Sequence, residues 1–319
     1  GRSDWGAFVT LGQHSEHVGH LGGSQALAYA VSANGGVVVG ESSNSSDVYQ
    51  AFRWTPSSGI QNLGSLGGRS HAYGVSDDGN VVAGYSVVGP DYHSWRWTPE
   101  TGMFDIGSLA QGGQHNTVAY GVSGDGRVIT GSGTLPGAAN VHAFRWTPEN
   151  GMQDIGGLGG FTYGFAANLD GSVITGYGFL PGNQHPFHAF RWTAAGGMLD
   201  LGTLGSLSTV SNAISSDGTV IVGTANNFDT GYRVPFVWTP ATGIVSLTTF
   251  LASRGVTPEP GWTFQTATGV SGDGRTILGN GIYYGQQRAF LVKFPPANPI
   301  VSSPQSVNFS GGPVGPVSY

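Results

Sequence analysis

The sequence contains no cysteine and little charge. Its 319 residues include 12 Lys or Arg and 18 Asp or Glu, which gives a net charge of −6. Without Cys the chain has no disulfides, no thiolate zinc ligands and no cysteine nucleophile. Lys293 is the single Lys, whereas binding to a phosphate backbone requires clustered cations. These absences exclude a nucleic-acid partner.

Long hydrophobic runs are also missing. No run approaches the ~18 apolar residues that a membrane-spanning helix needs, so we expect no membrane span in this chain. Charged residues make up only 9% and hydrophobic residues 39%, which does not fit a self-repelling disordered chain. The 56 Gly residues must mark many turns. Together these features predict an all-β chain of short strands.

The sequence repeats itself. The segment AYGVSDDGNVVAG at residues 72–84 returns as AYGVSGDGRVITG at 119–131 and ATGVSGDGRTILG at 267–279. A second block, such as AFRWTPENGMQDIG at 143–156, follows each copy. The repeated tryptophans recur about every 45 residues, which is typical of a repeat architecture. We count six such units.

Each unit contains four predicted strands, with Asp-Gly or Asn-Gly after the first and Thr-Pro-x-x-Gly after the third. Four strands per unit of about 45 residues indicate a propeller blade; a β-helix would need much shorter rungs. The sixth unit stops after its third strand, and residues 6–12 resemble a fourth strand. We therefore predict a six-bladed β-propeller of four-stranded antiparallel blades over residues 1–294, whose last blade is closed by the N-terminal strand. The Pro/Ser/Gly-rich residues 295–319 are interpreted as a linker or tail.

The segment HAFRWTPENGMQDIGGLGG at residues 142–160 resembles the bacterial "extracellular repeat, HAF family". The resemblance covers about residues 20–294, and the blade order is also similar to that of WD-repeat propellers. It implies export to the cell surface or the medium and supplies no reaction. Only two units have the literal His-Ala-Phe, at His142 and His188; Gln50, Ser94, Pro235 and Arg288 stand at or near its first position in others.

Residues that recur in most units are expected to be scaffold. We assign this role to the five repeated tryptophans and to the arginines that precede four of them, which we expect to bond carbonyls or carboxylates of a neighbouring blade: Arg53, Arg96, Arg145 and Arg191. The Asp residues of the hairpin turns bond the local backbone. Seven acidic residues lie outside the repeat: Asp4, Glu16, Glu41, Asp47, Asp91, Asp229 and Glu259.

Most non-repeated polar residues fall on one predicted face, formed by the loops between second and third strands and by the linkers. Function usually resides on variable loops held by a rigid scaffold. The candidate ligand-binding residues are Asp91, His115, His142, His185, His188, Asp229, Trp262, Tyr283 and Arg288. The longest insertion, residues 248–266, is expected either to form one wall of a cleft or to plug the propeller axis.

The most coherent chemistry on this face is that of His, Tyr and Arg. Cleavage of a uronic-acid glycan by β-elimination needs an Arg to neutralise the carboxylate and a base and an acid, roles that His and Tyr can fill. The candidate catalytic residues are Arg69, His71, Tyr92, His93, Tyr232 and Arg233. Hydrolysis would instead need two facing carboxylates, for which Glu41, Asp91 and Asp229 are available.

A binding surface without catalysis is the leading hypothesis, because exposed Tyr and Trp suit sugar or protein recognition. The partner would be an extracellular polysaccharide or a surface protein, and the protein a monomer outside the cell or on a bacterial surface. A glycan-active enzyme is second and a structural spacer third. His14, His17 and His20 suggest a metal site, but a lone loop triplet lacks supporting ligands. We expect no cofactor, with a structural calcium ion left open.

Overall fold

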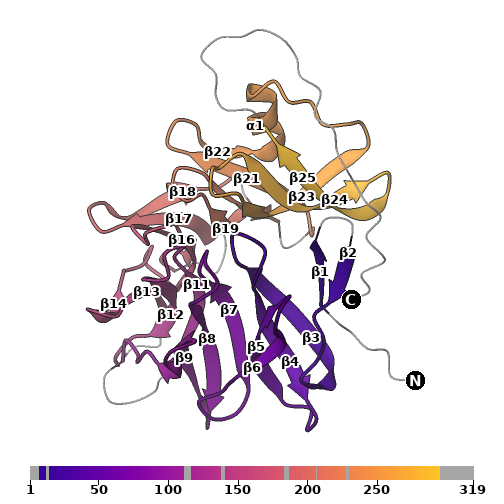
Figure 1. Cartoon of the computed structure of the whole chain (residues 1–319). Helices are drawn as coiled ribbons and strands as arrows, with labels where there is room; N and C mark the ends of the chain where they lie inside the picture. The colour runs from indigo at the N-terminus through magenta and orange to yellow at the C-terminus, as the bar shows by residue number, and fades with distance from the viewer. Residues whose placement is uncertain are drawn as a thin grey trace. The chain divides into compact units, whose positions relative to one another are not determined.

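The computed structural model describes most of the chain as β-strands. The described residues are 7–11, 14–110, 116–137, 141–182, 187–205, 207–227 and 230–294. They form two compact units. The N-terminal unit comprises Gly1–Gly157 and Phe161–Gly171, and the C-terminal unit comprises Leu158–Gly160 and Ser172–Tyr319. Within each sheet, neighbouring strands are consecutive in the chain (Figure 1).

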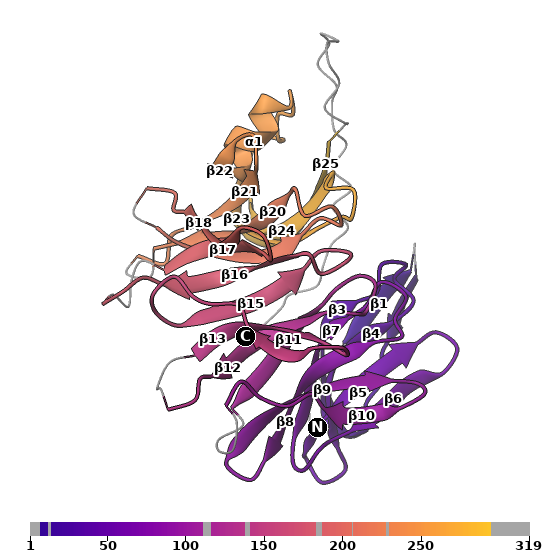
Figure 2. The ribbon, with the colours of Figure 1, turned by 90° about the vertical axis from the view of Figure 1, so that its left-hand side faces the viewer.

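The N-terminal unit contains three complete four-stranded antiparallel sheets, together with the first strand of the fourth. The first consists of β3 (Gly22–Val31), β4 (Val38–Asn44), β5 (Tyr49–Thr55) and β6 (Gly59–Gly64). The second consists of β7 (Ser70–Val75), β8 (Val82–Val88), β9 (Asp91–Thr98) and β10 (Gly102–Asp105). The third consists of β11 (Thr117–Val122), β12 (Ile129–Thr134), β13 (Val141–Thr147) and β14 (Gly151–Asp154). The first strands β3, β7 and β11 lie side by side (Figure 2).

The remaining sheets follow the same order. The fourth consists of β15 (Thr162–Ala167), β16 (Val173–Phe179), β17 (Phe187–Thr193) and β18 (Gly197–Gly202). The fifth consists of β19 (Ser208–Ile214), β20 (Ile221–Asn226), β21 (Arg233–Thr239) and β22 (Gly243–Ser246). The sixth, as described, consists of β23 (Trp262–Val270), β24 (Thr276–Tyr283) and β25 (Gln286–Lys293). The all-β prediction is confirmed, with four strands in five sheets and three in the sixth.

The structure does not show the N-terminal segment in the place that we expected. β1 (Phe8–Leu11) pairs with β2 (His14–His17) in a two-stranded sheet of its own, and the described sixth sheet has no fourth strand. A hairpin satisfies the backbone of β1 locally, and the chain after it packs on the first sheet. Val18 is buried against Val38 and Trp54, and its N–H donates to Ala7 O at 2.9 Å. The predicted closing strand is therefore not shown.

The Asp-Gly hairpins form as predicted. In the second sheet, Ser76 Oγ donates to Asp78 Oδ1 at 2.6 Å, and Val81 N donates to Ser76 Oγ at 3.0 Å. The hydrogen bond from Ser76, together with that from Asn80 N, holds the pKa of Asp78 below its usual range. The same Ser–Asp contact recurs at Ser123–Asp125, Ser215–Asp217 and Ser271–Asp273. These aspartates therefore shape turns, as the sequence indicated.

Replacing one of these serines by alanine should destabilise the fold. Ser76 is fully buried, and Ser76→Ala leaves the buried Val81 N–H without its acceptor. We expect the free energy of unfolding to fall by about 1–3 kcal/mol, as measured by urea denaturation. Ser45→Ala, at an exposed position, is the matched control and should change it by less than about 0.5 kcal/mol. Equal effects of the two substitutions would contradict this role.

Three of the four repeated arginines link consecutive sheets. Arg53 Nε donates to Gly79 O at 3.0 Å, Arg145 Nε to Gly171 O at 3.3 Å, and Arg191 Nε to Gly218 O at 3.4 Å. Each acceptor belongs to the hairpin turn of the following sheet. Arg96 differs, because its Nε has no hydrogen-bond partner among the described residues. The predicted bond to a neighbouring carbonyl is therefore confirmed for three of the four arginines.

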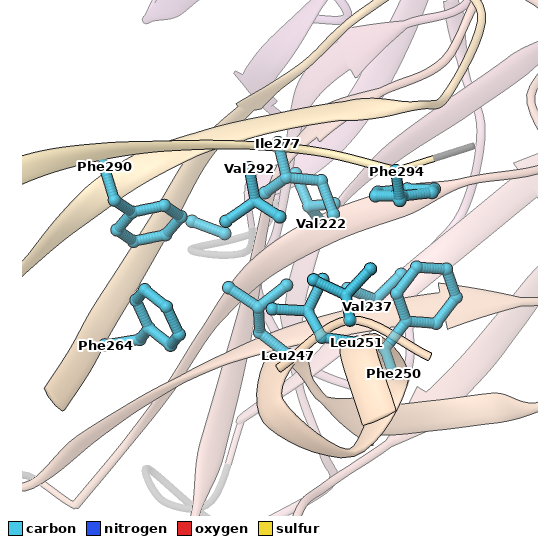
Figure 3. Close-up of a cluster of buried hydrophobic side chains, with 12 residues drawn as sticks. Val222, Val237, Leu247, Phe250, Leu251, Phe264, Ile277, Phe290, Val292 and Phe294 are labelled. Carbon is cyan, nitrogen blue, oxygen red and sulfur yellow. The ribbon is translucent and has the colours of Figure 1, made fainter. Parts of the chain in front are cut away.

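The long insertion is part of the hydrophobic core of the C-terminal unit. It begins with α1 (Leu247–Ser253), whose Leu247, Phe250 and Leu251 are buried. Figure 3 shows Phe250 near Phe294, and their ring centroids lie 5.3 Å apart. The helix thus packs against the apolar side chains of β21, β23 and β25. The start of the insertion therefore belongs to this core. The expected role of residues 248–266 as a cleft wall or an axial plug stays a prediction.

Candidate functional site

β-Bulges in the first strands of several sheets shape the site. The register of β7 with β8 shifts between Ala72 and Gly74, which leaves Tyr73 as the extra residue. Equivalent shifts in β3 and β11 flank Tyr29 and Tyr120. Bulges re-aim a side chain and are common next to functional sites. Neighbouring sheets therefore present tyrosines at equivalent points of adjacent strands.

These tyrosines form a continuous row with two more from β8 and β9. We call Tyr29, Tyr73, Tyr85, Tyr92 and Tyr120 the tyrosine row. Ring centroids lie 4.9 Å apart for Tyr29–Tyr73, 5.8 Å for Tyr73–Tyr120, 5.9 Å for Tyr73–Tyr85 and 5.4 Å for Tyr85–Tyr92. Tyr29 and Tyr92 are 44% and 45% exposed, and the other three are partly buried. The row is thus an aromatic surface that water reaches.

A buried carboxylate and an imidazole lie beside this row. Glu41 on β4 is only 6% exposed, and its Oε2 contacts His71 Nδ1. Tyr29 OH donates to Glu41 Oε1 at 2.9 Å, so both carboxylate oxygens have partners, as burial of a charge requires. The His71 ring stacks on Tyr85 at 4.6 Å. Glu41, His71 and three tyrosines of the row form one connected cluster.

Burial sets the protonation of the cluster. It lowers the pKa of His71 and raises the pKa of Tyr29 to about 12. Burial likewise raises the pKa values of Tyr73, Tyr85 and Tyr120. At neutral pH the phenols are therefore hydroxyl donors and His71 is neutral. Because Nδ1 faces the Glu41 carboxylate, it carries the ring proton, and Nε2 is left as the basic nitrogen.

The structure brings together three of the predicted catalytic residues. His71 and Tyr92 both contact the Tyr85 ring. The exposed Arg69 lies near enough for its charge to oppose in part the rise in the pKa of Tyr85 that burial causes. Tyr85 therefore connects an arginine, an imidazole and a second phenol. The catalytic role expected of these residues stays a prediction.

The cluster should make stability depend on pH. Because the pKa of His71 is lower in the folded chain, the unfolded chain takes up this proton first as the pH falls. The stability that comes from burying a neutral His71 is fully present above about pH 6.5, the pKa of His in the unfolded chain. It is lost as the pH falls towards the lower pKa of His71 in the folded chain. We expect wild type to lose more stability than His71→Gln between about pH 7.5 and pH 5 in chemical denaturation. Identical losses in the two proteins would contradict the burial of a neutral His71.

Three other predicted histidines, all within the described residues, pair within their own sheets. His93 Nδ1 lies 2.7 Å from Asp105 Oδ2, His142 Nδ1 lies 3.0 Å from Asp154 Oδ1, and His188 Nδ1 lies 2.8 Å from Asp200 Oδ1. Each pair joins the third strand to the fourth. The carboxylates also accept a backbone N–H two residues later, as Asp154 does from Gly156 N at 2.8 Å. The histidines of the HAF motif therefore have a repeated structural contact.

The remaining candidates lie elsewhere. Tyr232 and Arg233 are exposed and belong to the C-terminal unit, whereas Arg69 and His71 belong to the N-terminal unit. Trp262 and Tyr283 do come together, with ring centroids 4.9 Å apart. Asp91 begins β9 opposite Val88, and Arg288 Nη1 donates to Gln287 O at 2.9 Å. The candidates outside the described residues are His115, His185 and Asp229.

Sequence reasoning missed most of the row. Tyr73 and Tyr120 recur in the AYGVS motif, and the search for functional residues was confined to residues that do not recur. The sequence did contain a signal that these tyrosines are not required by the repeat, because the equivalent positions of the fifth and sixth sheets hold Asn212 and Thr268.

Among the described residues, no group of three or more His, Asp or Glu is placed to hold a metal ion. In the same part of the chain, no helix is long and apolar enough to cross a membrane.

Comparisons with solved structures identify the architecture. The β-propeller domain of the Trilobed protease from Pyrococcus furiosus matches with a TM-score of 0.55 and 12% identity over 89% of this chain and 87% of that one. A TolB protein from Agrobacterium tumefaciens matches with a TM-score of 0.54 and 12% identity over 88% and 94% of the two chains. The fold is a β-propeller.

Other propellers match equally well. An oligogalacturonate lyase in complex with manganese has a TM-score of 0.55 and 12% identity over 89% of this chain and 80% of that one. The chain spans 56% of the length of TolB from Acinetobacter baumannii, at a TM-score of 0.52. Identities of 10–14% show the propeller fold alone. No family model matches the sequence, and no curated protein matches it.

Proposed function

We propose that this chain is an exported β-propeller of the HAF-repeat type that binds a glycan along the tyrosine row. The observation that carries the proposal is the row itself, five partly exposed phenols at centroid spacings of 4.9–5.9 Å. Ring faces of this kind suit the apolar C–H face of a pyranose, and phenol hydroxyls hydrogen-bond its hydroxyl groups. The Lys-poor surface and the HAF-like motif support a place outside the cell or on a bacterial surface.

Several features favour a sugar over a protein partner. A phenol hydroxyl can both donate and accept hydrogen bonds, as the hydroxyl groups of a sugar do. The row follows several strands of a rigid scaffold, and rigid aromatic groups bind with little loss of conformational entropy. Glu41 and His71 add polar groups beside it. The proposed monomer would have six blades and would carry the binding surface on its N-terminal unit.

Affinity electrophoresis tests the proposal. Native protein is run through gels that contain dextran, a neutral galactomannan or polygalacturonate, three polymers that differ in backbone and charge. We expect at least one polymer to retard the protein relative to a polymer-free gel. Unchanged mobility in all three gels would contradict glycan binding and would favour the third hypothesis, a spacer within a larger surface protein.

A second candidate function, β-elimination of a uronic-acid glycan, is favoured by the Glu41–His71 contact beside Tyr85. His71 Nε2 would remove the proton from the carbon next to the sugar carboxylate. The released electron pair would form a carbon–carbon double bond, the glycosidic carbon–oxygen bond would break, and a phenol would protonate the leaving oxygen. Arg69 would neutralise the carboxylate. The alternative two-carboxylate hydrolysis is less well supported, because Glu41 already has His71 and Tyr29 as partners.

The two activities give different products. An eliminase releases unsaturated ends that absorb in the ultraviolet, whereas a hydrolase releases saturated reducing ends. With polygalacturonate as substrate, we expect any ultraviolet signal to fall by about 10²-fold or more in His71→Gln. A signal that is unchanged in this variant would exclude His71 as the base, and binding without any new ends would leave recognition as the function.

A further inference from the structure

The hairpin between β24 and β25 contains a tyrosine in an unusual backbone conformation. Tyr283 pairs with Gln286, so the loop consists of Tyr284 and Gly285. Both have positive φ, at 45° and 79°. A two-residue loop of this type favours Asn, Asp or Gly at both positions. A bulky side chain in the left-handed region costs about 1–2 kcal/mol, so turn formation does not explain Tyr284.

The surroundings hold the Tyr284 ring in place. A Cβ atom added to Gly261 would lie 2.7 Å from the Tyr284 ring, which shows how closely the ring approaches this backbone. Gly261 has a φ of 97°, and Tyr284 N donates to Gly261 O at 3.1 Å. One face of the ring therefore rests on backbone. The residue is nevertheless 69% exposed, which leaves the opposite face open to a ligand.

Polar and aromatic groups border this open ring. The Tyr283 ring stands at 69° to Tyr284, with centroids 4.7 Å apart. The Trp262 ring packs against Tyr283, with centroids 4.9 Å apart. Tyr283 OH donates to Glu259 Oε2 at 3.4 Å, and Glu259 is exposed. A flat aromatic face thus has a perpendicular wall and a carboxylate acceptor next to it.

We infer that this hairpin is a second sugar-binding site, located on the C-terminal unit. One pyranose ring stacks its C–H face on the open face of Tyr284, and its hydroxyl groups donate to the Glu259 carboxylate. Backbone strain at an exposed aromatic residue is a pointer to function rather than to stability. The inference rests on the proposed glycan ligand but concerns residues separate from the tyrosine row.

The decisive variant is Tyr284→Asn. Asn suits this turn position, so the substitution should leave the melting temperature unchanged or raise it while it removes the stacking surface. In gels containing dextran, galactomannan or polygalacturonate, we expect the dissociation constant for the polymer that retards wild type to rise about tenfold. Glu259→Gln should weaken retardation by a smaller factor. A ring with a purely structural role would give the opposite pattern, a lower melting temperature with unchanged retardation.

The same gels separate this inference from the proposed function. If Tyr73→Ala loses retardation and Tyr284→Asn retains it, the tyrosine row binds glycan and the second site is refuted. Loss in Tyr284→Asn with full retention in Tyr73→Ala refutes the row and supports the hairpin site. Partial losses in both variants support two sites. Wild type that moves freely in all three gels refutes both.

Discussion

Replacement of Gly84 by alanine is expected to lower the free energy of unfolding by at least about 3 kcal/mol. Gly84 lies on β8 opposite Ala72, directly before Tyr85 of the tyrosine row. A Cβ atom at this position would overlap the carbonyl oxygen of His71 and would lie 2.8 Å from the Trp95 ring. Trp95 is fully buried, so neither neighbour can move away without disturbing the sheet. The substitution should also displace His71 from Glu41.

Chemical denaturation measures this effect, and Gly196→Ala is the matched control. A Cβ atom at Gly196 would meet only Thr193 Oγ1, at 3.0 Å, so that variant should stay within about 0.5 kcal/mol of wild type. Similar stabilities for the two variants would show that the close approach at Gly84 can relax. The same overlap exists at the equivalent positions of other sheets, Gly40, Gly131, Gly223 and Gly279.

Tyr73→Ala is expected to weaken glycan binding by about 30-fold, which corresponds to about 2 kcal/mol. Tyr73 is the centre of the row, because its ring lies within 6 Å of Tyr29, Tyr85 and Tyr120. Residues at the centre of a binding surface usually carry most of its energy. Affinity electrophoresis over a range of polysaccharide concentrations gives the dissociation constant.

Two further variants control this measurement. Tyr73→Phe keeps the ring and loses the hydroxyl, so it should retain most of the affinity if stacking dominates. Phe104→Ala removes a 36%-exposed aromatic side chain from the outer strand β10 and should bind like wild type. If Phe104→Ala weakens binding as much as Tyr73→Ala does, the ligand does not recognise the row.

The sheets could be predicted from the sequence because their signals are local. Asp-Gly turns and Thr-Pro-x-x-Gly turns flank short strands in nearly every unit, and each turn joins strands that pair with each other. The partner of the N-terminal strand could not be predicted in this way. An alternation of apolar and polar residues identifies a strand but not the strand with which it pairs. β1 pairs with β2, which begins only three residues after β1 ends.

The candidate site could be predicted only in part. His71, Arg69 and Tyr92 stood out because they do not recur. Tyr73 does recur, and its position depends on a register shift between Ala72 and Gly74. No sequence pattern predicts this shift. The pairing of the HAF histidines with aspartates could have been predicted, because His142 and Asp154 lie on adjacent strands of one predicted hairpin.

The arginine links between sheets give the chain a direction of assembly. Gly79 follows Arg53 by 26 residues, and Gly218 follows Arg191 by 27. During translation each arginine is therefore synthesised before the glycine whose carbonyl accepts its hydrogen bond. In each of the three contacts the acceptor lies later in the sequence than the arginine. Each of these sheets therefore gains its arginine hydrogen bond only after the hairpin turn of the next sheet has been synthesised.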